Sequence, residues 1–185
     1  MSLIMQASAQ MELSGEANAR LRDAMTPRAA VQSLLDGGEA GDALKLLARL
    51  LPKRYVVAWL CQCAREQQLS VEDRAGASLA EKWAREPNEA NRRAAFEFAN
   101  AGGYKSLGAW IAAAAGWADG SLAPARQETP VPPPEHLTAC AAVAAVNMMA
   151  ALAPGEFATR RIAFIQRAMD LLGTQGPQGA PAKQA

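Results

Sequence analysis

Aromatic residues, cysteine and net charge are all scarce in this chain of 185 residues, and each shortage excludes something. Aromatic side chains make up only 5% of the chain, so we expect a core of close-packed helices with small contact residues. Lysine and arginine number 19 against 18 aspartates and glutamates, without clustering of either sign. We therefore expect no nucleic-acid partner and no membrane-surface partner, because each needs a basic face.

The three cysteines form an odd count without the spacing of a disulfide framework: Cys61, Cys63 and Cys140. This usage is typical of a reducing compartment, where cysteine serves as a small buried hydrophobe. Residues 1–11 contain no lysine or arginine and no sustained apolar run, so they do not form a secretion signal. The most apolar later segment, 137–153, is too short for a membrane span. We expect a cytoplasmic protein.

Helix start and stop signals predict about eight helices, and no segment shows the alternation of a strand. The clearest predicted N-caps are Thr26, Ser70, Asn88 and Ser106. Glycine or proline follows most of the helical segments and ends them. The fold class is therefore all-α, a single compact bundle. Because the predicted helices also fall loosely into pairs, a solenoid is the lesser alternative.

The same signals divide the chain into three parts. Residues 1–25 have weak periodicity and no clear caps, so we expect a flexible N-terminal arm. Residues 26–173 form the all-helical domain, and residues 174–185, rich in glycine, proline and glutamine, form a disordered tail. Between the sixth and seventh helices, residues 120–134 contain Gly120, Pro124 and the proline cluster of 130–134, which exclude helix. We expect this proline-rich segment to be extended and semi-rigid.

The fifth predicted helix carries an amide at the head of an otherwise apolar face. Asn91 leads a stripe at spacings of three and four whose other members are Ala94, Ala95, Phe98 and Ala99. If the Asn91 amide is buried, it must find hydrogen-bond partners. Gly102 stands where this helix needs a left-handed closing residue.

Candidate catalytic and metal-binding residues are few. His136 and Cys140 are four apart on one helix face, but nothing in the sequence supplies an activated thiolate or a transition-state stabiliser, so we favour a surface or packing role. Cys61 and Cys63 point about 200° apart on a helix and cannot easily share one metal ion. The sequence therefore predicts no catalytic, cofactor-binding or metal-binding residue and no small-molecule substrate.

Six residues are candidates for contact with a protein partner: Arg92, Arg93, Trp117, Val131, Pro132 and Arg161. Arg161 interrupts the apolar stripe of the last helix, and Arg92 stands one turn before Phe96. Each arginine either covers apolar surface with its stem or makes a specific ion pair or partner contact. Trp117 either stacks on the proline-rich segment or belongs to an exposed patch.

Several stretches of the sequence resemble one family. They are Ala58–Arg65 (AWLCQCAR), Glu86–Ala95 (EPNEANRRAA), and Ala109–Trp117 followed by the glycine and proline clusters of 120–124 and 130–134. Together they are similar to an uncharacterised bacterial family, a domain of unknown function often encoded beside type VI secretion genes. The resemblance covers residues 26–172. It implies a cytoplasmic accessory role in loading or chaperoning a secreted effector or spike component, and it carries over no catalytic residue.

Three functions follow as hypotheses. The first is a non-enzymatic protein-interaction module, an adaptor or chaperone-like factor that binds a secretion effector, a spike component or a related accessory protein. The second is an immunity protein that neutralises a toxin by direct binding, although such proteins often carry a concentrated charged face. An enzyme is the least favoured, since the sequence shows no catalytic constellation.

Overall fold

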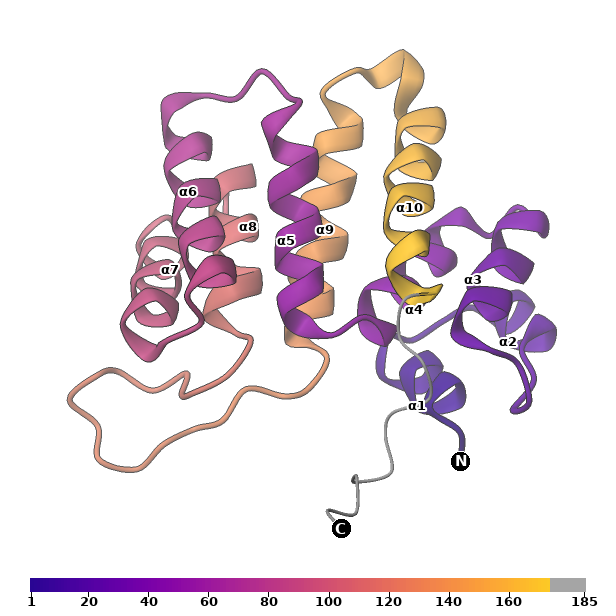
Figure 1. Ribbon diagram of the computed structural model, residues 1–185, viewed down its shortest axis with the longest axis horizontal. Coiled ribbons are helices and arrows are strands. Elements are labelled where there is room, and N and C mark those ends of the chain that lie inside the picture. The colour runs from indigo at the N-terminus through magenta and orange to yellow at the C-terminus, as the bar shows by residue number, and fades with distance from the viewer. Residues whose placement is uncertain (174–185) are drawn as a thin grey trace, which may run out of the picture.

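The computed structural model describes residues 1–173, in which all regular structure is helical (Figure 1). The elements are α1 (Leu3–Gln10), α2 (Gly15–Arg20), α3 (Pro27–Asp36), α4 (Ala40–Leu50), α5 (Lys53–Arg65), α6 (Val71–Arg85), α7 (Glu89–Ala101), α8 (Leu107–Gly116), α9 (Leu137–Ala151), the 3-10 turn η1 (Pro154–Glu156) and α10 (Phe157–Gly173). The all-α prediction is confirmed. Over the described range the chain forms ten α-helices, two more than expected.

The predicted helix starts agree with the structure. In each case the side-chain oxygen of the cap accepts a hydrogen bond from the backbone N–H three residues on, as expected for an N-cap. These caps are Thr26 for α3, Ser70 for α6, Asn88 for α7 and Ser106 for α8. The end of α7 differs in one residue. Gly102 keeps a right-handed φ of −74°, and Gly103 is the left-handed closing residue, with φ +59°.

The two unexpected helices lie in residues 1–25, so the expectation of a flexible arm there is corrected. The helices α1 and α2 each begin at a serine cap, Ser2 and Ser14. Their buried side chains and those of the following turns join the core, namely Ile4, Ala7, Met11, Leu13, Ala17 and Leu21. Helices of eight and six residues are too short to show a clear 3.6-residue period, which is why sequence periodicity missed them. The predicted tail, residues 174–185, lies outside the described residues.

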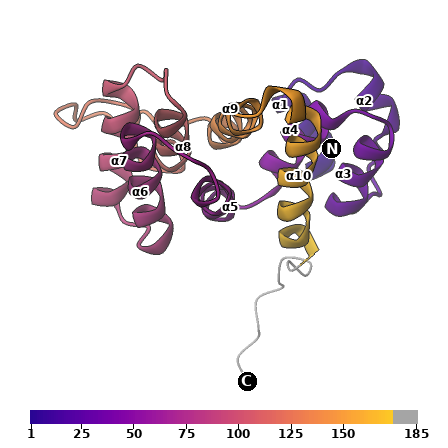
Figure 2. The ribbon, with the colours of Figure 1, turned by 90° about the horizontal axis from the view of Figure 1, so that it is seen from above.

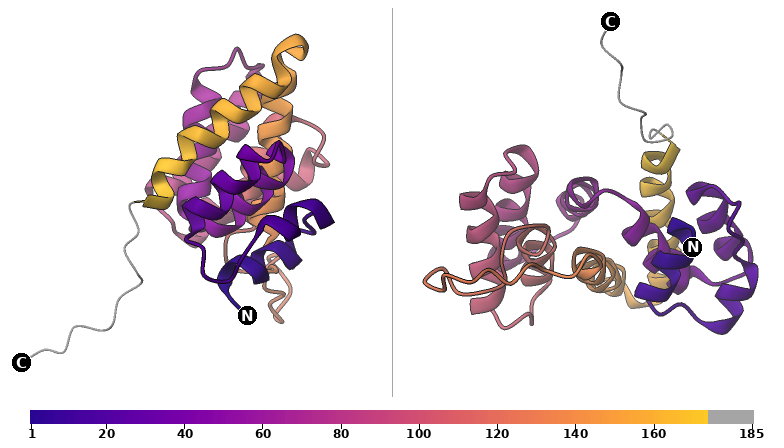
Figure 3. Two further views of the ribbon diagram at one scale, coloured as in Figure 1. Left: turned by 90° about the vertical axis from the view of Figure 1, so that its right-hand side faces the viewer. Right: turned by 90° about the horizontal axis from the view of Figure 1, so that it is seen from below.

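The helices form an elongated bundle (Figures 1, 2 and 3). Helices α5 and α9 run through the middle, α6 to α8 lie at one end, and α1 to α4 with α10 lie at the other. Helix α4 packs against both α9 and α10, which are far from it in sequence. A solenoid would bring together only neighbouring repeats, so these contacts favour the bundle.

No single helix within residues 1–173 has both the length and the apolar character needed to cross a membrane. Helices α9 and α10 meet those criteria only as a pair, and the pair is bent by 115° at its break.

Helix α8 is the centre of the end formed by α6, α7 and α8. It packs against α6, α7 and α9, and every residue of Leu107–Gly116 except Trp110 is buried. Small residues allow this close packing. A Cβ added to Gly76 of α6 would lie 2.2 Å from the carbonyl oxygen of Gly108, and one added to Gly116 would lie 2.6 Å from the Cα of Phe96. The backbones of α6, α7 and α8 are therefore in direct contact, which fixes the position of the C-terminal end of α8.

Candidate functional site

Residues 117–136, which connect α8 to α9, contain no helix or strand and extend from one edge of the bundle (Figure 1). We call this segment the anchored loop. Its two halves are joined at a neck, where the backbone N–H of Leu122 donates to the carbonyl of Val131 at 2.8 Å. The Ser121 hydroxyl oxygen accepts from the N–H groups of Ala123 (3.1 Å) and Val131 (2.9 Å). One serine side chain thus closes the neck.

Arg92 of α7 ties the start of the anchored loop to the bundle. Its residue is 1% exposed, and its guanidinium forms two short bonds to the Glu89 carboxylate, at 2.6 and 2.7 Å. The remaining donors reach the carbonyl of Gly116 at 2.6 Å and that of Ser121 at 3.4 Å. Gly116 is the last residue of α8, so its carbonyl has no partner within the helix. Arg92 therefore joins α7, the end of α8 and the loop.

The surroundings of Arg92 are shaped to admit it. Gly120 has a φ of +71°, and a Cβ at this position would lie 2.5 Å from the Arg92 Nε atom. Both the left-handed backbone and the lack of space require glycine there. Beside it, Arg93 donates to the carbonyl of Ala123 at 2.9 Å, and its guanidinium lies 5.3 Å from the centre of the Phe96 ring. Two successive arginines thus hold the first half of the loop.

Hydrogen bonds from Arg92 hold the pKa of Glu89 below its ordinary value, an effect that slight burial opposes and the charge of Arg93 assists. Glu89 is accordingly ionised at neutral pH, and its side chain is 61% exposed to solvent. A buried guanidinium is costly unless it is paired and fully bonded. The ionised Glu89 supplies the charge that lets Arg92 remain buried.

The second half of the loop is attached to the bundle separately. The N–H of Leu137, the first residue of α9, donates to the carbonyl of Pro134 at 3.1 Å. The buried Thr138 hydroxyl donates to the carbonyl of Ala114 in α8 at 2.9 Å. Glu135 lies 3.5 Å from the Lys53 ammonium of α5. The loop is thus fixed at both ends, while residues 124–132 between them are all exposed.

An aromatic cluster, Tyr104, Trp110 and Trp117, lies at the base of the loop. The ring centres of Tyr104 and Trp117 are 5.3 Å apart, those of Tyr104 and Trp110 are 5.7 Å apart, and those of the two tryptophans are 6.0 Å apart. All three residues are half-buried, and burial raises the pKa of Tyr104. Trp117, the first residue of the anchored loop, therefore packs its ring against two aromatic neighbours.

The structure gathers five of the six predicted contact residues around the loop and leaves the sixth elsewhere. Val131, 45% exposed, and Pro132 are on its surface, and Trp117 is at its base. Arg92 pairs with Glu89 within the chain, so the ion-pair interpretation fits this residue, and Arg93 donates within the chain to the carbonyl of Ala123. Arg161 lies on α10, half-buried, with its guanidinium 5.0 Å from the centre of the Phe157 ring.

Sequence reasoning missed three residues of this site. Gly116, Gly120 and Ser121 lie in stretches that resemble the family, but the sequence predicts no individual role for any of them. The one available signal was the pair Gly120-Ser121, since glycine followed by serine is typical of a tight turn in which the hydroxyl bonds nearby backbone. Which arginine would meet that turn depends on tertiary packing.

The cysteines are buried or half-buried and free. Burial raises the pKa of Cys61 to about 12 and that of Cys63 to about 11, and it also raises the pKa of Cys140. The thiols are therefore protonated at neutral pH and are poor nucleophiles. His136 is half-buried at the start of α9. Within residues 1–173 no three histidine, cysteine or acidic side chains are grouped to hold a metal.

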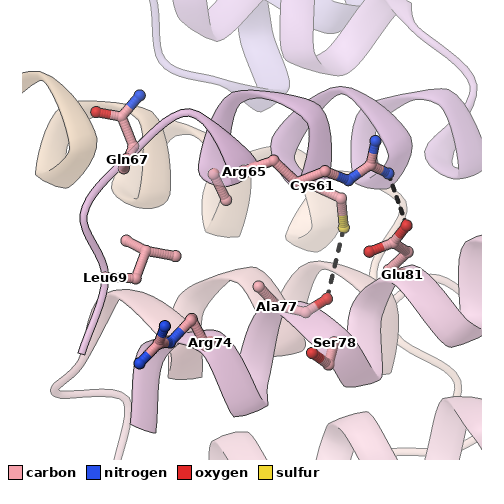
Figure 4. A pocket seen from close by; sticks show the side chains of 9 residues that line it. Cys61, Arg65, Gln67, Leu69, Arg74, Ala77, Ser78 and Glu81 are labelled. Atoms are coloured by element: carbon pink, nitrogen blue, oxygen red, sulfur yellow. Dashed lines mark hydrogen bonds and ion pairs between the residues drawn. The ribbon is translucent and has the colours of Figure 1, made fainter. Parts of the chain in front are cut away.

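A pocket of about 280 Å³ opens between α5 and α6 (Figure 4). Its floor includes Cys61, whose thiol donates to the carbonyl of Ala77 at 3.7 Å. Arg65 and Glu81 close one side with an ion pair at 2.6 Å, and the exposed Arg74 stands near the other side. Because Arg65 and Glu81 pair with each other and the volume is small for a ligand site, the pocket resembles a gap between helices more than a cofactor site.

Comparison with known proteins gives one match. A sequence model of a family of unknown function (DUF6931) matches residues 30–172. No curated protein and no solved structure matches the chain.

Proposed function

Because the chain belongs to this family of unknown function, we propose its role from the geometry: it is a non-enzymatic protein-interaction module that presents the anchored loop to another protein. The observation that supports this role best is the contrast, within residues 117–136, between an anchored base and an exposed middle part. A 1%-exposed arginine and a serine hydroxyl hold the base, and the nine residues from 124 to 132 are exposed. Surface loops held by a rigid scaffold are common sites of binding.

The charge and thiol chemistry support the same proposal. Acidic and basic residues are balanced, 18 against 19, so nucleic acid and membrane surfaces are unfavoured partners. The raised pKa values of Cys61, Cys63 and Cys140 leave protonated thiols. Contact with a protein, through exposed apolar and proline residues, is the use these features support best.

The cellular setting of the proposal comes from the sequence resemblance. A family often encoded beside type VI secretion genes suits a cytoplasmic adaptor or chaperone-like factor that assists the loading of an effector or a spike component. Such a role needs reversible binding, which a small, pre-ordered surface can give without a large apolar interface.

Co-purification with the products of neighbouring genes tests the proposal, with the tagged full chain as bait. Val131→Asp places a charge on the exposed loop, and Val71→Asp places the same charge on a valine at the start of α6 that is 78% exposed. We expect wild type and Val71→Asp to retain a partner and Val131→Asp to lose it.

Two results would count against the proposal. If the chain is a monomer that retains no partner, the interaction role is wrong. If Val131→Asp and Val71→Asp retain the partner equally, the binding surface is not the loop. A growth assay with a neighbouring toxin separates the immunity alternative, because only an immunity protein would restore growth when the two are expressed together.

A further inference from the structure

The exposed part of the anchored loop ends in a run of four prolines and one valine, Pro130-Val131-Pro132-Pro133-Pro134. Each proline ring fixes φ near −65°. The residue before a proline is pushed towards extended conformations, and this constraint applies to Val131, Pro132 and Pro133. The run contains no helix or strand. These constraints together favour the polyproline II conformation, which has three residues per turn.

A polyproline II helix has three edges, and its side chains are distributed among them. Residues three apart share an edge, so the rings of Pro130 and Pro133 lie on one and the side chains of Val131 and Pro134 on the next. Four of the five residues are exposed, and Pro133 is half-buried. Prolines lack a backbone N–H, so the run cannot add to a partner's sheet as a regular strand.

The carbonyls of the run divide into two sets. Those of Val131 and Pro134 accept bonds from Leu122 and Leu137, so the run is held at two points by its own chain. The carbonyls of Pro130, Pro132 and Pro133 accept no bond from any residue in the described range 1–173. An extended ridge of rings with free carbonyl acceptors is therefore offered to the outside.

Anchoring makes the run ready to bind. A flexible proline-rich segment loses conformational freedom when it docks, whereas this one is already ordered by the neck and by Arg92 and Arg93. Grooves that take polyproline II segments are lined by aromatic rings, between which proline rings pack, and they carry donors that reach the carbonyls.

We propose that residues 130–134 are a polyproline II ligand and that the partner binds them in an aromatic-lined groove. This inference rests on the proposed function, because it specifies the chemistry of the partner at the same loop.

Nuclear magnetic resonance titration of the ¹⁵N-labelled full chain tests it, with an isolated SH3 domain and an isolated WW domain as probes of known groove chemistry. The test variant, Pro130→Ala/Pro133→Ala, removes two rings from one edge, and neither residue makes a side-chain bond that the loop would lose. Pro124→Ala is the matched control, because it removes an exposed proline ring of the same loop outside the run.

We expect at least one probe to shift the Val131 amide resonance in wild type and in Pro124→Ala, and to bind the double variant about tenfold more weakly or worse. The partner that co-purifies with the chain should show the same loss. The inference would be overturned if neither probe shifts the Val131 amide resonance, and equally if the co-purifying partner binds the double variant as well as wild type. The absence of any co-purifying partner would instead count against the proposed function, and the titration would still decide the character of the run.

Discussion

Helices α3, α4, α5 and α10 are held together by large side chains, whereas α6, α7 and α8 also approach one another backbone to backbone at glycines. In the first region the fully buried side chains include Leu34, Leu44, Leu47, Trp59 and Ile165. The Trp59 indole N–H also donates to the carbonyl of Phe164 at 3.0 Å. In the second region, Gly76 meets Gly108 and Gly116 meets Phe96 at backbone distance.

The difference shows what each kind of packing can do. Large side chains supply most of the buried apolar area and therefore most of the stabilisation. Contacts between backbones contribute less area but set the spacing of the helices to within fractions of an ångström. That spacing brings the carbonyl of Gly116 to 2.6 Å from the Arg92 guanidinium, and so the loop is anchored where the helix backbones approach most closely.

The largest expected loss of stability is in the first region. Trp59→Ala should lower the free energy of unfolding by about 3–5 kcal/mol, as truncation of a large core residue does. Urea unfolding measures the change, and Tyr55→Ala on the same helix, at a residue that is 42% exposed, is the control for losing an exposed aromatic ring. A loss below about 1 kcal/mol for Trp59→Ala would contradict its place in the core.

Adding a single methyl group should lower the stability of the second region. Gly76→Ala introduces a Cβ 2.2 Å from the carbonyl oxygen of Gly108, and such overpacking should cost about 1–3 kcal/mol in the same urea measurement. Gly41→Ala in α4 is the matched control, because its Cβ would meet only the Arg161 side chain, at 3.6 Å. Alanine there should be neutral or stabilising, owing to its higher helix propensity. If both substitutions prove neutral, the backbones of α6 and α8 are not in contact.

A smaller effect is expected at Asn91, in α7 of the second region. Its residue is 7% exposed, and its amide donates to the carbonyl of Glu86 at 2.9 Å. Asn91→Ala should cost about 1 kcal/mol, because the buried bond from the amide is lost, while the Glu86 carbonyl keeps the backbone N–H of Asn88 at 2.8 Å. Asn100→Ala, at an exposed residue of the same helix, should leave the urea midpoint nearly unchanged. Equal midpoints for the two variants would mean that the Asn91 bond contributes nothing.

The smallest effect concerns pH. The pKa of Glu89 is lowered in the folded state, so its pair with Arg92 stabilises the fold above the ordinary pKa of 4.5, and this contribution is lost as the pH falls through the folded value. The difference in stability between wild type and Glu89→Gln should therefore shrink on acidification below pH 4.5. Glu97→Gln, on the same helix, controls for removal of an exposed charge. A difference that stays constant with pH would contradict the pairing.

Much of the fold was predictable because its signals are local. The caps at Thr26, Ser70, Asn88 and Ser106 need only neighbouring residues, and eight helices followed from them and from apolar periodicity. The helices α1 and α2 were missed because their few apolar residues acquire a helical pattern only by packing on α3 and α4. Their serine caps, Ser2 and Ser14, were the local signals available.

The candidate site was less predictable, because its bonds join distant residues. The sequence singled out Arg92 and Arg93 and the proline-rich segment separately. That Arg92 turns inward depends on Gly116, which is 24 residues away, and on the space that Gly120 leaves. No spacing rule along the chain encodes such a contact, since it arises from the crossing of α7 and α8.

Backbone hydrogen exchange of the Leu122 and Val131 amides shows whether Arg92 keeps the anchored loop ordered. Arg92→Met keeps an apolar stem but removes the bonds to Glu89, Gly116 and Ser121. Arg126→Met, at an exposed residue of the same loop, is the control. Should Arg92→Met fail to fold, Ser121→Ala is the alternative variant, because it removes only the two bonds that the hydroxyl accepts at the neck.

We predict that the two amides exchange at least about tenfold faster in Arg92→Met than in wild type or Arg126→Met, while amides of α5 keep their protection. Unchanged exchange rates at Leu122 and Val131 in both Arg92→Met and Ser121→Ala would mean that neither side chain orders the anchored loop.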